Sequence, residues 1–310
     1  MEQFTFGLSI IYPIFLVIGL GFYLGKKQIL NEELQSSLSH LVFYYAMPLK
    51  LFTEITGKGT SLSFDWIYLF YMVLGLLAIY FLSWLLAKGL GLSGPETASF
   101  VQTAYRSNFI FIGFPILDMV LGTVNVPAVI LVSLFLIPLN NILAIFVLAS
   151  NMPGSEHLSL KDKCLQALKN PVIIATLFSV ACLLIKIPLP KGLLQATKII
   201  GQMSSPLGLL LIGSNLAQIQ LLSFNKLAFF AALIRTFLSP LPLLILGRLL
   251  HFPQESMLVA FVFFASPCAA NNFIFTKAMG GDTTLVSQGI FYSCLLAIFF
   301  LPLLYTLVTF

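Results

Sequence analysis

Apolar stretches long enough to cross a bilayer follow one another along the whole chain. They fall near residues 7–25, 34–56, 65–88, 94–121, 126–149, 170–187, 193–219, 225–250, 254–279 and 284–309. A membrane-crossing helix needs about 20 predominantly apolar residues. Only 9% of the residues are charged, against about 25% in soluble domains. The sequence therefore predicts an all-α polytopic membrane protein with ten transmembrane helices in the lipid bilayer.

Lysine and arginine are unevenly divided between the alternate connections. One side carries Lys26, Lys27, Lys88, Lys161, Lys163, Lys169 and Lys226, with Lys277 near the ninth connection, and the other Lys58, Lys186, Lys191 and Arg248. Positive residues favour the cytoplasmic side, so we expect both termini outside the cell (inner) membrane and the 151–169 loop in the cytoplasm. The N-terminal apolar stretch has no basic region before it and is interpreted as a retained helix. The positive charges form no block with interleaved aromatic residues, so no nucleic-acid partner is expected.

Prolines recur at a fixed shift of 158 residues. Pro13, Pro48 and Pro95 are matched by Pro171, Pro206 and Pro253. The same shift preserves the order of the predicted helices, which favours an internal repeat over a chance recurrence among 16 prolines. Residues 1–150 would form a first five-helix repeat and 170–310 a second, joined by the cytoplasmic linker 151–169. An odd number of spans inverts the second repeat relative to the first, as in many transporters.

The fourth predicted helix contains an unusual polar segment, residues 105–118. It carries Arg106, Ser107 and Asn108, followed by Gly113 and Pro115. Proline removes a backbone donor and glycine adds freedom, so we expect the helix to kink or unwind at Gly113–Pro115. Unpaired backbone at membrane depth is tolerated only against protein or a wet cavity, which makes this break a candidate binding site.

The repeat shift carries the break onto Asn271–Phe273, in the polar part of the ninth predicted helix. A second alignment, with a six-residue gap, pairs Ser107–Phe111 with Asn271–Phe275. The prolines favour the ungapped register. In both registers, broken helices from the two repeats would meet near the bilayer midplane.

Several of these motifs resemble the auxin efflux carrier family, the bacterial permeases related to the plant PIN auxin exporters. They are Arg106-Ser107-Asn108 with Gly113-Phe114-Pro115, then Lys169-Asn170-Pro171, Ser205-Pro206-Leu207, and the segment from Ser266-Pro267 to Lys277-Ala278-Met279-Gly280-Gly281-Asp282. Two departures from the plant pattern stand out. The chain lacks a long central cytosolic loop, and Asn272 stands where the plant proteins place a crossover proline.

The resemblance implies a fold like that of the sodium/bile acid symporters and NhaA. Two inverted five-helix repeats would have broken crossover helices 4 and 9, and scaffold and transport domains would each draw on both repeats. It also implies elevator-like movement and substrates such as auxin or small organic acids, including malate or malonate.

The polar residues at the two breaks are the candidate substrate-binding residues. Arg106 would grip a substrate carboxylate, together with Ser107, Asn108, Gly113, Pro115, Asn271 and Asn272. Opposed half-helix N-termini would add positive partial charge. The alternatives are that Arg106 snorkels or pairs with Asp118 or Glu54, and that the asparagines only join helices.

Four further intramembrane charges have two interpretations each. Glu54 and Asp118 are candidate ion-coupling residues, or static partners of Lys50 and Arg106. Lys50 and Arg235 are candidate secondary anion contacts, or members of ion pairs between helices.

The sequence favours a secondary active transporter for a small organic anion. Its coupling ion would be a proton or sodium, and it would need no cofactor or metal. No nucleotide-binding or catalytic motif appears, so an intramembrane enzyme is disfavoured. A channel or a non-transporting ligand sensor on the same fold is the alternative, and a homodimer is compatible with the sequence.

Overall fold

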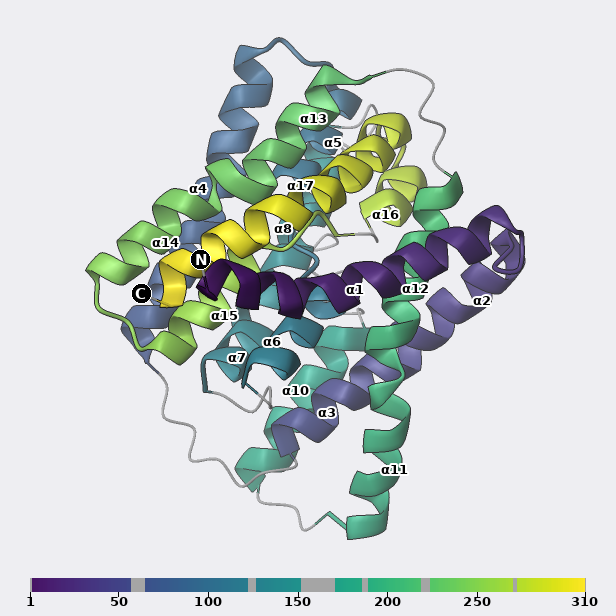
Figure 1. Cartoon of the computed structure of the whole chain (residues 1–310), viewed down its shortest axis with the longest axis vertical. Helices are drawn as coiled ribbons and strands as arrows, with labels where there is room; N and C mark the ends of the chain where they lie inside the picture. Colours follow the sequence, from purple (N-terminus) through teal and green to yellow (C-terminus); the bar gives the residue numbers. More distant parts are fainter. Residues whose placement is uncertain are drawn as a thin grey trace.

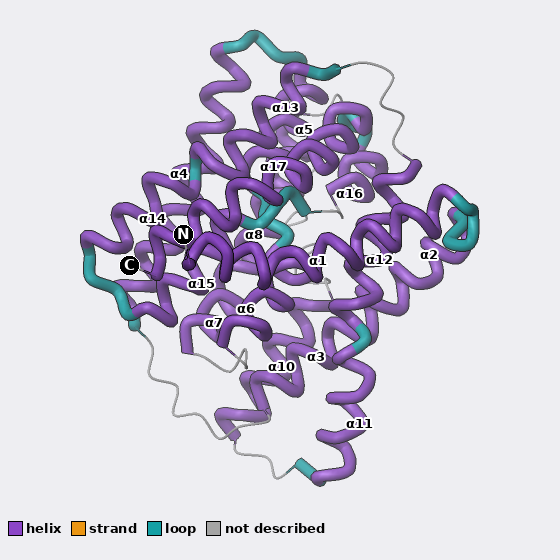
Figure 2. The backbone as a smooth tube through the Cα atoms, viewed as in Figure 1, coloured by secondary structure: helices purple, strands orange, loops and turns teal. Residues whose placement is uncertain are grey.

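The structure is a computed structural model that describes residues 2–56, 65–121, 127–151, 171–185, 189–218, 224–269 and 272–309. Within these ranges the chain is almost wholly helical (Figure 2). The extended pairing that the described residues contain is an isolated bridge between Ser107 and Cys268. The predicted linker lies outside the described residues except for Asn151. The described part thus agrees with the predicted all-α class.

Helical segments coincide with the first five predicted spans. They are α1 (Glu2–Lys26); α2 (Glu32–Leu41), η1 (Val42–Ala46) and α3 (Met47–Thr56); α4 (Trp66–Gly89); α5 (Gly94–Tyr105), η2 (Phe109–Gly113) and α6 (Phe114–Leu121); and α7 (Pro127–Leu131), η3 (Val132–Leu136) and α8 (Ile137–Asn151). The η segments are single wide turns of π-helix, whose hydrogen bonds reach five residues along the chain.

The second half of the chain follows the same order. Its segments are α10 (Pro171–Ile185); α11 (Lys191–Gln202) and α12 (Ser204–Gln218); α13 (Lys226–Leu233), η5 (Ile234–Leu238) and α14 (Pro240–Leu249); α15 (Gln254–Ala265) and α16 (Asn272–Met279); and α17 (Thr283–Thr309). Of the described helices, five are long and apolar enough to cross a membrane: Trp66–Gly89, Pro127–Asn151, Lys191–Gln218, Lys226–Leu249 and Thr283–Thr309.

Local sequence explains where several helices begin. The Asp65 side chain accepts hydrogen bonds from the backbone N–H groups of Ile67 and Tyr68 at the start of α4. Ser93 and Glu96 form a reciprocal capping box at the start of α5. These side chains satisfy backbone donors that have no partner inside the helix.

The fourth predicted helix is interrupted before Gly113–Pro115, the segment where the sequence predicts the interruption. Residues 106–108 are non-helical, and Arg106 is extended, with φ −84° and ψ 111°. At Gly113 and Pro115 the chain remains helical, because the wide turn η2 accommodates the irregularity: the N–H of Phe114 donates to the carbonyl of Phe109. The helix is therefore not unwound at Gly113–Pro115; the other form of the prediction, a kink there, stays a prediction.

The ninth predicted helix is interrupted before the predicted place, Asn271–Phe273, because Asn272 and Phe273 already belong to the next helical segment. Residues 266–269 are non-helical, residues 270–271 lie outside the described part, and α16 begins at Asn272. The first half-helices, α5 and α15, have equal lengths of 12 residues.

The helices pack in two groups. In the first group, α1 packs on α12, and α3 packs on α10 and α11. In the second, α5 packs against α4, α8, α13 and α17, and α15 packs against α14 and α17. Figure 1 shows α1 across the middle of the view, with α3, α10 and α11 below it and α5 and α13 above it. Contacts of α1 with α17 and of η2 with α12 join the two groups.

Glycines allow the closest of these helix contacts. A Cβ atom at Gly213 of α12 would collide with the carbonyl oxygen of Ile18, and one at Gly21 of α1 would collide with the carbonyl oxygen of Leu210. Small residues let membrane helices approach until their backbones touch. The α1–α12 crossing therefore depends on the absence of side chains at these positions.

We predict that Gly213→Ala destabilises the protein by about 1–3 kcal/mol, the usual effect of overpacking. Thermal unfolding in detergent measures the change. Gly19→Ala is the matched control, because a Cβ atom at Gly19 would have no neighbour within 4 Å. Equal melting temperatures for the two variants would contradict the proposed close packing.

Candidate functional site

The broken ends of the fourth and ninth helices hydrogen-bond to each other. The N–H of Asn108 donates to the carbonyl of Pro267 at 2.8 Å, and the N–H of Ala269 donates to the carbonyl of Arg106 at 3.0 Å. Between these bonds, Ser107 and Cys268 form the antiparallel bridge. Because a bilayer supplies no water to unpaired backbone groups, this mutual pairing stabilises two interruptions that neither helix could sustain alone.

Arg235, on the wide turn η5, completes the hydrogen bonding of the two helix ends. Its fully buried guanidinium donates to the carbonyls of Tyr105 and Phe264, and to that of Phe263 at 3.2 Å. These carbonyls are the C-terminal ends of α5 and α15, where each helix carries about half a negative charge. One cation thus neutralises both ends.

Arg106, the residue that follows α5, is buried and held by neutral partners. Its guanidinium donates to the side-chain oxygens of Asn272 at 2.7 Å and Asn141 at 2.5 Å. Its Cζ lies 4.6 Å from the centre of the Phe275 ring. No carboxylate of the described residues contacts it, so its charge has no counter-ion there.

A small cavity lies beside Arg106, where the first and second helix groups meet. Its volume is about 30 Å³, far below the several hundred Å³ typical of small-molecule sites. Its polar wall consists of Arg106, Ser107, Asn108, Asn140 and Asn141, and its apolar wall includes Phe43, Met47, Ile137 and Phe263. Among the described residues that line it, none is acidic.

Four polar atoms of this wall lack a hydrogen-bond partner in the described part of the chain. They are Arg106 Nε, Ser107 Oγ, Asn108 Nδ2 and Asn140 Oδ1, all buried. A buried polar group without a partner costs about 1–3 kcal/mol. The wall therefore has the capacity to bind a polar ligand, chiefly through donors, without losing any bond that the helix breaks need.

The structure brings together only part of the predicted substrate site. Ser107, Asn108 and Arg106 line the cavity, while Asn272 lies behind Arg106 and orients it. Gly113 and Pro115 are not among the residues that line it, and Asn271 lies outside the described residues.

From the sequence, Asn140 and Asn141 are expected only to hydrogen-bond between helices; α8 places both in the cavity wall, opposite the break. Two adjacent asparagines in an apolar helix were the available signal. Nothing in the local sequence distinguishes the other wall residues Phe43 and Met47.

The remaining predicted charges lie elsewhere. Lys50 Nζ is 3.4 Å from Asp118 Oδ2 and 2.8 Å from Ser205 Oγ, an arrangement that matches the static-partner interpretation. Arg235 contacts helix-end carbonyls and not the cavity. Glu54 belongs to α3, but its side chain is outside the described part. In the described ranges, no three His, Cys, Asp or Glu side chains gather as metal ligands would.

We predict that Arg235→Met lowers the melting temperature more than Arg235→Lys. The methionine leaves three buried carbonyls without donors, at about 1–3 kcal/mol each, whereas lysine retains the charge and part of the hydrogen bonding. Thermal unfolding in detergent separates the two variants. A methionine variant as stable as the wild type would contradict the role of Arg235 in joining the helix ends.

Comparison with known proteins places this arrangement in a family. The family described as "Membrane transport protein" matches residues 7–305. An "Uncharacterized transporter YfdV" from Escherichia coli (strain K12) is 24% identical over 277 residues, which cover 87% of each chain. Relatives of the same description from Escherichia coli O157:H7 and Shigella flexneri match equally. The chain therefore belongs to the membrane transport protein family, which is the auxin efflux carrier family.

Proposed function

We propose that the protein is a secondary transporter for a small organic anion bearing a carboxylate, and that the cavity at the helix crossover is its binding site. The observation that carries this proposal is a buried arginine without an acidic partner in the described part of the chain, beside unsatisfied donors. A carboxylate would supply both the missing negative charge and the missing acceptors.

The present partners of Arg106 suit exchange with a ligand. The oxygens of Asn141 and Asn272 are neutral, whereas a carboxylate would add a full negative charge and could accept two parallel hydrogen bonds from the guanidinium. A substrate carboxylate could therefore take over part of the guanidinium without leaving a buried acid unpaired. The half-helix N-termini at η2 and α16 add positive partial charge to the same region.

A carrier agrees better with this geometry than a channel does. The cavity of about 30 Å³ is too small for an organic acid, so binding requires the helices around it to separate. A channel needs a continuous pathway, whereas a carrier exposes its site to one side at a time. The occluded cavity supports alternating access.

The arrangement of the helices supports an inverted repeat with an elevator movement. A shift of 158 residues moves the bounds of α4 to 224–247, and the observed helix there is Lys226–Leu249. The same shift moves the bounds of α5 to 252–263, where α15 is observed. Both observed helices begin two residues later than the shift predicts. We propose ten membrane-crossing segments in two repeats. The first group (α1, α3, α10, α11 and α12) would be the static scaffold, and the second would carry the crossover across the membrane.

The test is uptake of labelled anions into proteoliposomes that contain the full-length protein. We expect saturable uptake of at least one acid from a panel of malate, malonate, other small carboxylates and indole-3-acetate. Arg106→Ala should weaken anion binding about ten- to a hundredfold, because a hydrogen bond to a charged group contributes about 1.5–3 kcal/mol. Asn108→Ala should weaken it less.

Lys191→Gln provides the matched control, because Lys191 is an exposed cation at the start of α11, away from the cavity. It should transport like the wild type. Binding without flux would identify a sensor. Unchanged affinity in a well-folded Arg106→Ala protein would remove the anion-binding role from this residue, and uptake of uncharged solutes alone would overturn the substrate class.

The Lys50–Asp118 contact gives a second prediction, because it joins α3 of the proposed scaffold to α6, which continues directly from η2 at the crossover and would move with it. If the groups slide past each other, this pair breaks in each cycle. We expect Lys50→Ala to change kcat up to about fivefold, equivalent to the roughly 1 kcal/mol of a partly exposed ion pair, with KM little changed.

Uptake with and without a proton or sodium gradient separates this role from ion coupling. If Asp118 only pairs with Lys50 and carries no ion, transport by Asp118→Asn should change as in Lys50→Ala and should still respond to the gradient. Loss of the gradient response in Asp118→Asn alone would instead make Asp118 the coupling residue.

A further inference from the structure

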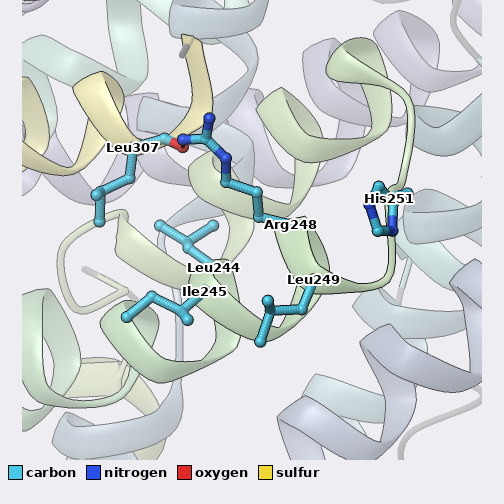
Figure 3. Close-up of a pocket in the computed structure, with 6 residues that line it drawn as sticks. All are labelled: Leu244, Ile245, Arg248, Leu249, His251 and Leu307. Carbon is cyan, nitrogen blue, oxygen red and sulfur yellow. Dashed lines mark hydrogen bonds between the residues drawn. The ribbon is translucent and has the colours of Figure 1, made fainter.

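A second cavity lies far along the chain from the crossover residues, at the C-terminal ends of α14 and α17. It measures about 290 Å³ and is lined by Leu244, Ile245, Arg248, Leu249, His251 and Leu307 (Figure 3). This is close to the lower end of the volumes of small-molecule sites, about 300–1,000 Å³. Neither the crossover geometry nor the proposed transport uses it.

The walls of this cavity suit a hydrocarbon chain. Four of the six lining residues are leucine or isoleucine. Ile245 and Leu249 are 46% and 68% exposed, and the neighbouring Leu246 and Leu250 are also exposed. In a membrane protein such exposed aliphatic side chains face lipid, so an acyl chain is the natural occupant of the apolar part.

The rim of the cavity suits a phosphate group. Figure 3 shows the Arg248 side chain extending from the end of α14 to the backbone of Leu307, whose carbonyl accepts a hydrogen bond at 3.0 Å. A guanidinium is a planar fork of donors whose geometry matches the oxygens of a phosphate. His251 adds an imidazole on the turn that follows α14.

The position of the cavity at the ends of two long helices explains why an aliphatic wall and a cationic rim occur together. Lys226–Leu249 and Thr283–Thr309 are both long and apolar enough to cross the membrane, and the cavity lies where both end. Helix ends lie at the level of the lipid headgroups. The aliphatic wall therefore adjoins the hydrocarbon, and the arginine adjoins the phosphates, in the order in which one phospholipid presents them.

We propose that this cavity is a binding site for an anionic phospholipid, with an acyl chain against Leu244, Ile245 and Leu249 and the phosphate on Arg248. The proposal is independent of the transported substrate. It accounts for a cation and an aliphatic wall in one cavity, which neither a free anion nor a hydrocarbon alone would require.

Lipid binding to the purified full-length protein tests the proposal. Native mass spectrometry and thermal unfolding would be measured with phosphatidylglycerol and with phosphatidylcholine of the same acyl chains. We expect phosphatidylglycerol to bind more tightly and to raise the melting temperature more. Arg248→Gln should weaken its binding about fivefold, the effect of one cation near an anionic lipid surface, and should remove most of the preference over phosphatidylcholine.

Two further variants keep the result interpretable. Lys226→Gln, which removes an exposed cation at the start of α13, should retain the preference for phosphatidylglycerol. Ile245→Trp fills the apolar part and should displace the lipid while Arg248 remains. Because Ile245 is half-exposed, this variant tests the site even if Arg248→Gln fails to fold.

Three outcomes would overturn the proposal. Equal binding of the two lipids in the wild type would mean that the cavity binds acyl chains and does not distinguish the two headgroups. A stabilisation reproduced by inorganic phosphate alone would indicate a free-anion site. Exclusion of lipid upon self-association would mean that a second copy of the chain covers the cavity.

Discussion

The structure depends on the mutual hydrogen bonding of two helix breaks. A membrane helix can be interrupted only if something other than water satisfies its backbone. Here the segment after α5 and the segment after α15 satisfy each other through Asn108, Pro267, Arg106 and Ala269, and Arg235 binds the carbonyls that remain. The surrounding helices α8, α13 and α17 pack around this crossing, so the second helix group is organised by a feature that neither half of the chain could form alone.

The two buried arginines at the crossing have different roles because their partners differ. Arg235 contacts backbone carbonyls at the negative ends of two helices, so its charge is compensated by the fold itself. Arg106 contacts only amide oxygens and an aromatic ring, and its Nε has no partner in the described part. This contrast in partners, and not the presence of arginine as such, is the basis for proposing that Arg106 binds the substrate and that Arg235 is structural.

Membership of a membrane transport family and the observed geometry constrain function together. The family establishes a membrane transporter, and under the proposed function the small cavity at the crossover would have to open by movement between the helix groups. The contacts within and between the groups differ. The α1–α12 crossing lies inside the first group and is held by glycines at backbone contact, whereas the Lys50–Asp118 ion pair, at 3.4 Å and partly exposed, joins α3 to α6.

The sequence by itself determined the helical class, the approximate spans and the polar segment at Arg106–Asn108, because hydrophobic length and intramembrane charge are local properties. Tertiary structure decided the rest. Gly113 and Pro115 remain helical because a wide turn and tertiary packing override their local preference. Asn141 became a partner of Arg106, and Arg235 a partner of two helix ends, because chain segments 35 and about 130 residues apart meet at the crossing. No local pattern encodes such meetings, since they depend on where a polar group finds its hydrogen-bond partner after the helices have packed.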